Sequence, residues 1–592
     1  MTSAAAIHAV SEGLHKLHVL PKVSTDAEDH GEAIGHSSVG GGGQSGLRSV
    51  NAKGVLRVSR ALTAMLATEG VISDQDAEGD LAHPSAAVKA LLEKPHIKVP
   101  PELLDKSHPL SEYFISSSHN TYLMGEQLYG TSGSEGYEVA LQTGARCVEI
   151  DAWDNEENKE EPKVTHGYTL ASHIPFRLVC ETIRNVMDHE AKASARSGSR
   201  PGPILISLEN HCHAQGQQRI VSIFKEVLGD RLISKAVRDE GHEEQKETGT
   251  QVRLEELEAK VALIVEFYFP DGKEIAAEEA MKEEEEVEVH DPNEDEAAKQ
   301  ARLKFEETKK NAPKPKIIPE LAELGVYAQS VKPRDRSWLE GQLKGGPHDH
   351  LINVSETQVT DLMGSSKAQL AQHNSKHLMR VFPKGTRITS SNMNQVPYWG
   401  VGAQICALNW QTFGCALQLN EAMFAGSDGY VLKPAALRAG GSGQVSSGKK
   451  KKLQMLVEGA TDLHIPPEYQ IVVEPYVTCT LHHPDDLKNV RPKQKTEPYR
   501  SHKLTSRYKH FAPPASNPIW GKTLEWEYEE NELAFLRILI KSEETFHKNP
   551  AWAVAAVRLS YVQQGWSFIR MLDLSGGETN CTLLVRFTIT DA

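Results

Sequence analysis

Short apolar segments alternate with stretches of helical periodicity from Tyr113 onward. The apolar segments are YFISSSH, CVEIDAW, ILISLEN and VALIVEFYF, followed after an interruption by RVFP, ICALN and GYVLKP. Such alternation is typical of parallel strands joined by crossover helices. The pattern therefore predicts an α/β fold, a (β/α)8 barrel of the TIM type that the interruption splits into two halves.

A different pattern fills the C-terminal part of the chain. Segments such as IVVEPYVTCTLH, FLRILIK and TLLVRFTIT are separated by polar turns, a spacing that predicts an antiparallel β-sandwich. Before the barrel, glycine-rich polar sequence predicts a disordered tail. Apolar residues at helical spacing follow it, and they predict a helix that packs on a larger domain or binds a partner.

The chain of 592 residues needs more than one core, because single cores stop growing at roughly 250–300 residues. Low-complexity charged sequence and a GGSG run followed by four lysines mark two linkers. The predicted division is a tail (1–54), a short helical segment (55–106), the first barrel half (107–270), an acidic linker rich in Lys and Pro (271–315), the second barrel half (316–440), a hinge linker (441–464) and the sandwich (465–592).

The composition excludes several classes of protein. A formal charge of −15 argues against a general nucleic-acid-binding protein. Seven scattered cysteines do not form a disulfide framework, which indicates a reducing compartment. No run approaches the about 18 apolar residues of a membrane-spanning helix, and the first residues lack a signal core. We expect a cytoplasmic protein whose contact with membranes is peripheral.

Polar side chains gather where the predicted barrel strands end. His119 and Asn120 follow the first strand, Glu149 and Asp151 lie two apart on one face of the next, and Glu209 ends ILISLEN. A barrel places its reactive groups at this end of its strands. Three carboxylates and an amide are hard oxygen donors, which calcium prefers, whereas zinc would need more nitrogen or sulfur.

Two further groups of residues have metal-binding side chains. His166 in KVTHGYTL is a second histidine at the end of a short strand. The neighbouring residues His211, Cys212 and His213 are interpreted as structural, because adjacent side chains on a strand point in opposite directions and seldom share an ion.

The motifs SSSHNTYL, GARCVEIDAWD, THGYTL and ISLENHC resemble, in this order, the X half of eukaryotic phosphoinositide-specific phospholipase C. PELAELGVYAQSVK, RVFPKGTRITSSNMNQVPYWGVGAQICALNWQT and SDGYVLKPAALR resemble its Y half, and the sandwich resembles its C2 domain more weakly. The resemblance is to delta-like members of the fungal or protist type. It implies a calcium-dependent enzyme of lipid signalling that acts on inositol phospholipids at an anionic membrane surface.

The resemblance also implies roles for particular residues. Asn120, Glu149, Asp151 and Glu209 would hold the catalytic Ca2+. Glu149 would be the general base, His119 would stabilise the charged phosphorus centre, and His166 would protonate the departing diacylglycerol oxygen. The products would be diacylglycerol and an inositol phosphate, formed through a cyclic phosphate.

The sequence departs from the family at the substrate phosphates. Where the family has two lysines for the 4- and 5-phosphates, this chain has Ile264 and Glu266. Ser355 and Arg380 match the remaining phosphate ligands, and Phe382 replaces a tyrosine. Because a carboxylate repels phosphate, we expect a preference shifted from the bisphosphate toward phosphatidylinositol or its monophosphate.

The flanking regions depart as well. The sandwich has Asn517, Glu543 and Glu544 where calcium-binding C2 domains have paired aspartates, so calcium binding there is not expected. A basic loop either attracts anionic lipid or is an ordinary solvated loop. It contains Lys488, Arg491, Lys493, Lys495, Arg500, Lys503, Arg507 and Lys509. Residues 72–81 are interpreted as a degenerate remnant of a helical calcium-binding loop, since their spacing does not fit the twelve-residue pattern.

Two other functions remain open at this point. One is a membrane-binding scaffold with a dormant barrel, which the side chains of Ile264, Glu266 and Phe382 would suit. The other is a phosphodiesterase for soluble glycerophosphodiesters, since a fold alone does not set the substrate.

Overall fold

The structure is a computed structural model of the whole chain. It describes residues 31–39, 56–78, 83–125, 127, 131–167, 172–197, 201–238, 251–268, 315–333, 336–341, 343, 346–385, 387, 389–466, 473–486, 491–500, 513–543 and 550–592. The predicted acidic linker lies outside these ranges except for residue 315. Most of the predicted tail lies outside them too, as do Glu544 and four members of the predicted basic loop.

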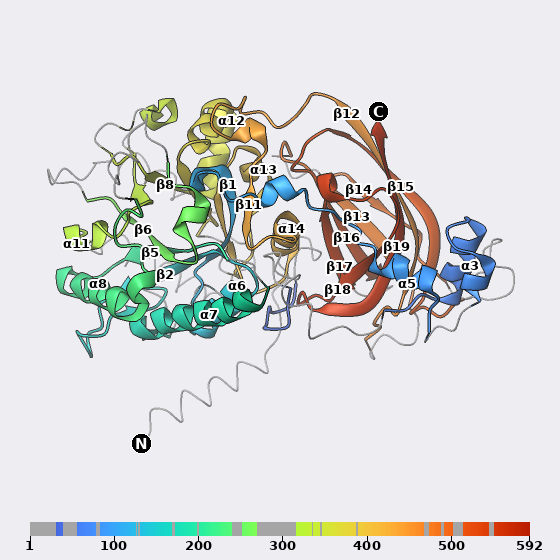
Figure 1. Cartoon of the computed structure of the whole chain (residues 1–592), viewed down its shortest axis with the longest axis horizontal. Coiled ribbons are helices and arrows are strands. Elements are labelled where there is room, and N and C mark those ends of the chain that lie inside the picture. Colours follow the sequence, from blue (N-terminus) through green and yellow to red (C-terminus); the bar gives the residue numbers. More distant parts are fainter. Residues whose placement is uncertain are drawn as a thin grey trace, which may run out of the picture.

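The N-terminal body is a closed barrel of eight parallel strands, as predicted, and helices cover it (Figure 1). It closes where β1 pairs with both β10 and β2. The strands are β1 (Tyr113–His119), β2 (Cys147–Trp153), β5 (Ile204–Asn210), β6 (Val261–Glu266), β7 (Gln329–Val331), β8 (His350–Ser355), β9 (Leu378–Phe382) and β10 (Ile405–Asn409). The helices include α6 (Glu135–Gln142), α7 (Phe176–Ser197), α8 (Ala214–Leu228), α11 (Pro319–Ala322), α12 (Glu356–Asn374), α13 (Val396–Gly400) and α14 (Cys415–Phe424).

Alternate residues of the barrel strands pack into two separate clusters. One set, with Val148 and Ile150 on β2, packs with residues of the surrounding helices. The other set packs inside the barrel near the amino ends of the strands, and it includes Ile115, Leu205, Leu351, Leu378 and Ile405. Because this inner cluster fills the amino end with apolar side chains, the inward polar residues are left at the carboxyl end.

The assignment of three strands in the barrel region differs from the sequence prediction. The segment GYVLKP forms β11 (Tyr430–Leu432), which pairs antiparallel to β1 and is not one of the eight barrel strands. Its place, and the eighth place that the seven apolar segments left unassigned, are taken by β7 and β8, which the apolar pattern did not mark. The strand β7 has only three residues, too few for a visible alternation.

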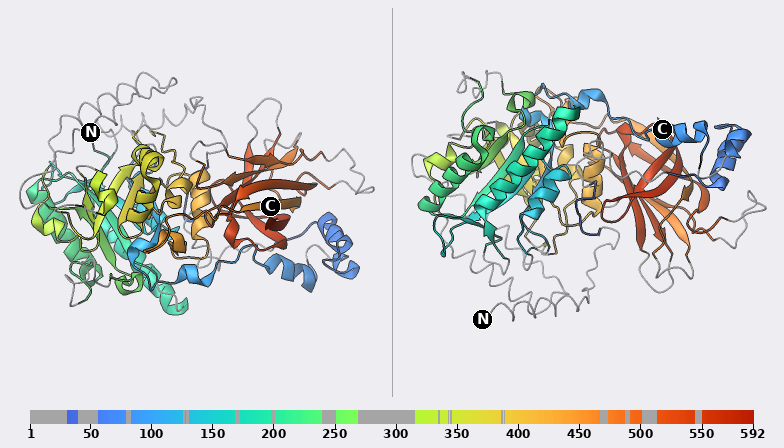
Figure 2. Two further views of the ribbon diagram at one scale, coloured as in Figure 1. Left: turned by 90° about the horizontal axis from the view of Figure 1, so that it is seen from above. Right: turned by 60° about the horizontal axis from the view of Figure 1, so that its bottom comes forward.

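The C-terminal body is an antiparallel β-sandwich, as predicted, and lies beside the barrel in both orientations of Figure 2. Its strands are hydrogen-bonded in the order β14-β13-β16-β17-β18-β19-β12-β15. They are β12 (Lys450–Thr461), β13 (Pro475–His482), β14 (Lys493–Lys495), β15 (Ile519–Glu529), β16 (Phe535–Ser542), β17 (Ala551–Arg558), β18 (Gly565–Leu572) and β19 (Glu578–Asp591).

The hinge predicted over 441–464 is wrong for half of its length, because residues 450–461 form strand β12. Leu453, Met455 and Val457 alternate along β12 and are fully buried in the sandwich core. The strand begins inside the lysine run, and Lys451 is held by Asp591 at 2.7 Å and Glu530 at 3.2 Å. Charged residues at the start of an otherwise alternating segment therefore belong to a strand here.

The predicted helical segment folds as α3 (Arg60–Thr68), α4 (Asp74–Ala77) and α5 (Ala86–Glu93). Leu62 and Leu66 of α3 are fully buried in a cluster with Phe568 and Leu584 of the sandwich. These helices lie on the side of the sandwich away from the barrel (Figures 1 and 2). The predicted amphipathic helix therefore packs on a larger domain of its own chain.

Part of the predicted disordered tail is ordered. Residues 31–39 lie between the two bodies, where the backbone of Glu32 donates to Leu574 O (2.7 Å) and accepts from Phe413 N (2.9 Å). Val39 N donates to Gly576 O at 2.7 Å. Backbone groups make these contacts, which explains why side-chain composition did not predict them.

Two further features concern the chain as a whole. All seven cysteines are buried, and none is joined in a disulfide. Within the described ranges, no helix combines the length and the apolar character needed to cross a membrane.

Candidate active site

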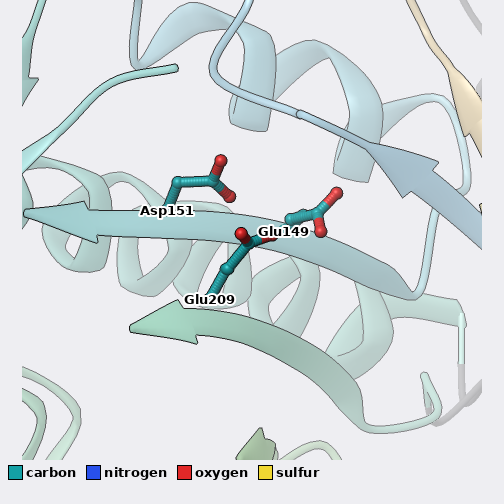
Figure 3. A group of neighbouring side chains, drawn as sticks. All are labelled: Glu149, Asp151 and Glu209. Atoms are coloured by element: carbon teal, nitrogen blue, oxygen red, sulfur yellow. The ribbon is translucent and has the colours of Figure 1, made fainter. Parts of the chain in front are cut away.

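Three carboxylates converge at the carboxyl end of the barrel (Figure 3). Glu149 and Asp151 lie on β2 and Glu209 lies on β5, and Asp151 pairs with Glu209 in the strand register. One oxygen from each of the three lies within 4.8 Å of the others. Glu149 and Asp151 share one face of β2 because they lie two residues apart, and the pairing of β2 with β5 places Glu209 beside them. The three predicted carboxylates therefore lie together, as the sequence indicated.

The loop that follows β1 adds Asn120 to this group. Its backbone N–H donates to Glu149 Oε2 at 2.8 Å, and its φ of 42° lies in the left-handed region, which is uncommon for residues other than glycine. Strain of this kind persists only where surrounding contacts enforce it, and it is typical of functional sites.

Asp151 is the electrostatic centre of the site. Its side chain is 4% exposed, and Oδ2 accepts a hydrogen bond from Tyr122 Oη at 2.5 Å. Its other oxygen, Oδ1, is buried without a hydrogen-bond partner. Burial and repulsion by Glu209 and Glu149 raise the pKa of Asp151 well above its usual value. A cation bound here would satisfy the orphaned oxygen and offset the repulsion, and the donor set fits calcium.

Each predicted catalytic histidine has its Nδ1 next to a carbonyl oxygen. His119 Nδ1 lies 2.8 Å from Asn409 Oδ1, and His166 Nδ1 lies 2.7 Å from Gln127 O. A carbonyl oxygen only accepts, so the network assigns the proton of the neutral ring to Nδ1 in both cases. The nitrogen without a proton in each neutral ring is therefore Nε2, and His119 Nε2 lies 4.0 Å from Glu149 Oε2. Burial lowers the pKa of His119.

Among the predicted substrate ligands, Arg380 lies in the centre of the site. It points into the barrel from β9, where Nη2 forms an ion pair with Glu149 Oε1 at 2.6 Å and Nη1 donates to Asn353 Oδ1 at 3.1 Å. Its guanidinium lies 5.6 Å from the ring centroid of Phe382. Ser355 is paired with Phe382 in the register, and its hydroxyl accepts from Gln358 N as the N-cap of α12.

The two residues that replace the family's lysines share one face of β6. Ile264 is 3% exposed within the inner apolar cluster, and Glu266 is exposed at the end of the strand. Since side chains two apart on a strand point the same way, Glu266 is directed to the barrel mouth. The structure therefore has an acidic group at this part of the mouth.

Within the part of the chain that the structure describes, the two histidines after β5 do not belong to the group of possible metal ligands. His211 stacks on Trp153 with centroids 4.0 Å apart and lies 3.0 Å from Glu209 Oε1. His213 is the N-cap residue of α8, and Cys212 is buried between them. Their structural interpretation agrees with these contacts.

Sequence reasoning missed three residues of the site, namely Tyr122, Gln127 and Asn409. Tyr122 lies within SSSHNTYL, so its place next to His119 was visible, although its bond to Asp151 was not. Gln127 and Asn409 are 282 positions apart and meet only in the folded barrel. No local pattern in the sequence joins them.

Comparison with known proteins adds two matches to family models. The model of the phosphatidylinositol-specific phospholipase C X domain matches residues 106–266, and that of the Y domain matches residues 321–436. The two ranges contain all eight barrel strands and the residues of the site described above.

Several curated proteins are similar over most of the chain. The pig 1-phosphatidylinositol 4,5-bisphosphate phosphodiesterase zeta-1 is 31% identical over 465 residues, covering 74% of this chain and 68% of the relative. The human delta-1 phosphodiesterase is 29% identical, covering 82% of this chain and 61% of the relative. The Candida albicans 1-phosphatidylinositol 4,5-bisphosphate phosphodiesterase 1 is 28% identical, covering 79% of this chain and 46% of the relative. The chain thus spans about half to two thirds of the length of these relatives.

Two crystal structures share the fold. PLC21 from L. pealei matches with a TM-score of 0.67 at 22% identity, covering 90% of this chain and 62% of that one. PLC21 from S. officinalis matches with a TM-score of 0.68 at 21% identity, covering 100% and 68%. With both halves of the barrel matched and the pig relative similar over two thirds of its length, the chain belongs to the phosphatidylinositol-specific phospholipase C family.

Proposed function

We propose that this chain is a calcium-dependent phospholipase C that cleaves inositol phospholipids into diacylglycerol and an inositol phosphate, through a cyclic phosphate. One observation supports this most directly: the buried, unpartnered Oδ1 of Asp151 in a cluster of three carboxylates, beside two histidines whose rings are held at Nδ1 by carbonyl oxygens. The relatives named above are phosphodiesterases of phosphatidylinositol 4,5-bisphosphate.

Calcium would be held by Asn120, Glu149, Asp151 and Glu209. When bound, it would lower the pKa of the inositol 2-hydroxyl and offset negative charge at the reacting phosphate. The exposed side chain of Glu209, 57% accessible, is the ligand nearest to solvent and gives the ion a route of entry.

The side chains of the barrel would move the protons. In the first step the 2-hydroxyl oxygen bonds to phosphorus and its proton passes to Glu149, while the bond from phosphorus to the glycerol oxygen breaks. His166 protonates that departing oxygen, and His119 stabilises the charged phosphorus centre. In the second step His166 takes a proton from water, whose oxygen bonds to phosphorus. The bond from phosphorus to the inositol 2-oxygen breaks, and Glu149 returns its proton to that oxygen.

The barrel mouth supports a shifted lipid preference. Glu266 is exposed at the end of β6 and would repel a ring phosphate, whereas a ring hydroxyl would donate a hydrogen bond to it. Arg380 is already paired with Glu149. We therefore propose better relative use of phosphatidylinositol or its monophosphate than the bisphosphate, at a cytoplasmic membrane surface that the protein contacts peripherally.

The test is diacylglycerol release from vesicles of phosphatidylinositol, its monophosphate and its bisphosphate, each with calcium and with chelator. Calcium-dependent release that His119→Ala abolishes supports the lipase. A strong preference for the bisphosphate would refute the shifted preference alone. No release from any of the three lipids, combined with binding to the vesicles, would favour the dormant scaffold.

A further inference from the structure

The side chain of Gln127 lies at the junction of the two barrel halves. It is 7% exposed, on the connection between β1 and α6, and it contacts Asn120 of the first half and Ser390 and Asn409 of the second. We propose that Gln127 is a positioning residue, which orients the amide of Asn120 so that an oxygen is available to a cation. The inference rests on the proposed function, because Asn120 is one of the proposed calcium ligands.

A backbone carbonyl in the second barrel half determines how the amide of Gln127 is oriented. Asn409 Nδ2 donates to Ser391 O at 3.0 Å, so Asn409 Oδ1 is the end that accepts. This oxygen accepts from His119 Nδ1 at 2.8 Å and from Gln127 Nε2 at 3.3 Å. Gln127 Nε2 also donates to Ser390 Oγ at 2.9 Å. The nitrogen end of the Gln127 amide is therefore fixed toward the second half.

The oxygen end of the Gln127 amide contacts the first barrel half. Gln127 Oε1 accepts from Asn120 Nδ2 at 2.8 Å. The two ends of an amide point in different directions, so Asn120 Oδ1 is the end not bound to Gln127. The backbone N–H of Asn120 meanwhile donates to Glu149. A reversed Asn120 amide would offer N–H groups to a cation, which cannot bind them.

Backbone strain marks the same place. Asn120 has a φ of 42° and Ser390 a φ of 54°, and they are two of the four non-glycine residues with positive φ in the described ranges. Both contact Gln127, and Ser390 Oγ also donates to Gly125 O at 2.7 Å. Strained residues persist where neighbouring contacts hold them. Gln127 thus joins the strained residue of one half to that of the other.

The experiment removes the amide while keeping the length of the side chain. In the full-length protein, Gln127→Met should weaken calcium binding about three- to tenfold in a calorimetric titration, and lower kcat for diacylglycerol release with little change in KM. The matched control is Gln411→Ala, because Gln411 anchors the same connection by donating to Leu123 O at 3.0 Å. We expect the control to bind calcium within about twofold of the wild type.

A second background separates positioning from general stability. In Asn120→Asp both side-chain ends are oxygens, so orientation no longer matters, and adding Gln127→Met should cost little calcium affinity. Equal losses in both backgrounds, or a Gln127→Met variant that matches the wild type, would overturn the inference. A wild type that binds no calcium and releases no diacylglycerol would instead refute the proposed function.

Discussion

Replacement of Asp151 by asparagine should stabilise the calcium-free protein while it destroys the site. Two unit charges 4.8 Å apart repel by about 3 kcal/mol at an effective dielectric constant of about 20, and Asp151 has two such neighbours. Arg380 partly neutralises Glu149, and Glu209 is exposed enough for water to screen it. We therefore expect a net gain of about 2 kcal/mol in the free energy of unfolding from Asp151→Asn.

Thermal unfolding in chelator measures this gain. A change of 1 kcal/mol shifts the melting temperature of a domain of this size by about 2 °C, so Asp151→Asn should melt about 4 °C above the wild type. Added calcium should raise the melting temperature of the wild type and leave that of the variant unchanged. Asp230→Asn, the same change at an exposed position, serves as control. An Asp151→Asn variant that melts below the wild type in chelator would show that repulsion does not dominate the site.

The stability difference between Asp151→Asn and the wild type should also depend on pH. The pKa of Asp151 is raised in the folded state, so the folded protein binds this proton more tightly than the unfolded chain. Its contribution to stability is complete below the unfolded pKa of about 4 and is lost as the pH rises through the folded pKa. The advantage of Asp151→Asn in chelator should therefore grow with pH. A constant difference across that range would contradict the assigned direction.

Three further predictions concern other parts of the molecule. His166→Ala should lower diacylglycerol release about 10²–10⁴-fold, because the proton donor to the departing oxygen is lost. Glu266→Lys should raise the ratio of bisphosphate to phosphatidylinositol turnover about tenfold or more, equivalent to at least 1.4 kcal/mol, while Glu323→Lys, the same change at the exposed C-cap of α11, should not. Leu62→Ala should destabilise the sandwich by about 2–5 kcal/mol in denaturant unfolding, since this fully buried side chain would leave a cavity; a change below about 0.5 kcal/mol would mean that α3 detaches.

The sequence indicated the carboxylates of the site because strand geometry is local. Glu149 and Asp151 share a face whatever the rest of the chain does, and parallel strands end at one edge. The roles of Arg380 and Asn409 required tertiary structure, because Arg380 on β9 meets Glu149 on β2, and Asn409 on β10 meets His119 on the neighbouring strand β1, from distant parts of the chain. Arg380 was expected to face a substrate phosphate, and the structure shows it paired with Glu149 at 2.6 Å.

The errors in the fold have physical causes of the same kind. The lysines at the start of β12 resemble a linker, although they lie on a strand whose later residues alternate. The segment 31–39 is held by backbone hydrogen bonds, which composition does not reveal. Both errors arose where side-chain chemistry and backbone pairing gave different signals.

The arrangement of the site explains why both barrel halves are needed. The first half supplies the histidines and the three carboxylates, and the carboxylates repel one another. The second half supplies the positive charge of Arg380 for Glu149 and the amide of Asn409 for His119. Without these partners Glu149 would lose its ion pair and His119 would lose its hydrogen bond at Nδ1. The closed barrel thus makes the charged interior tolerable in the absence of a cation, and the oxygen of Asp151 that is left without a partner is the one that a cation would satisfy.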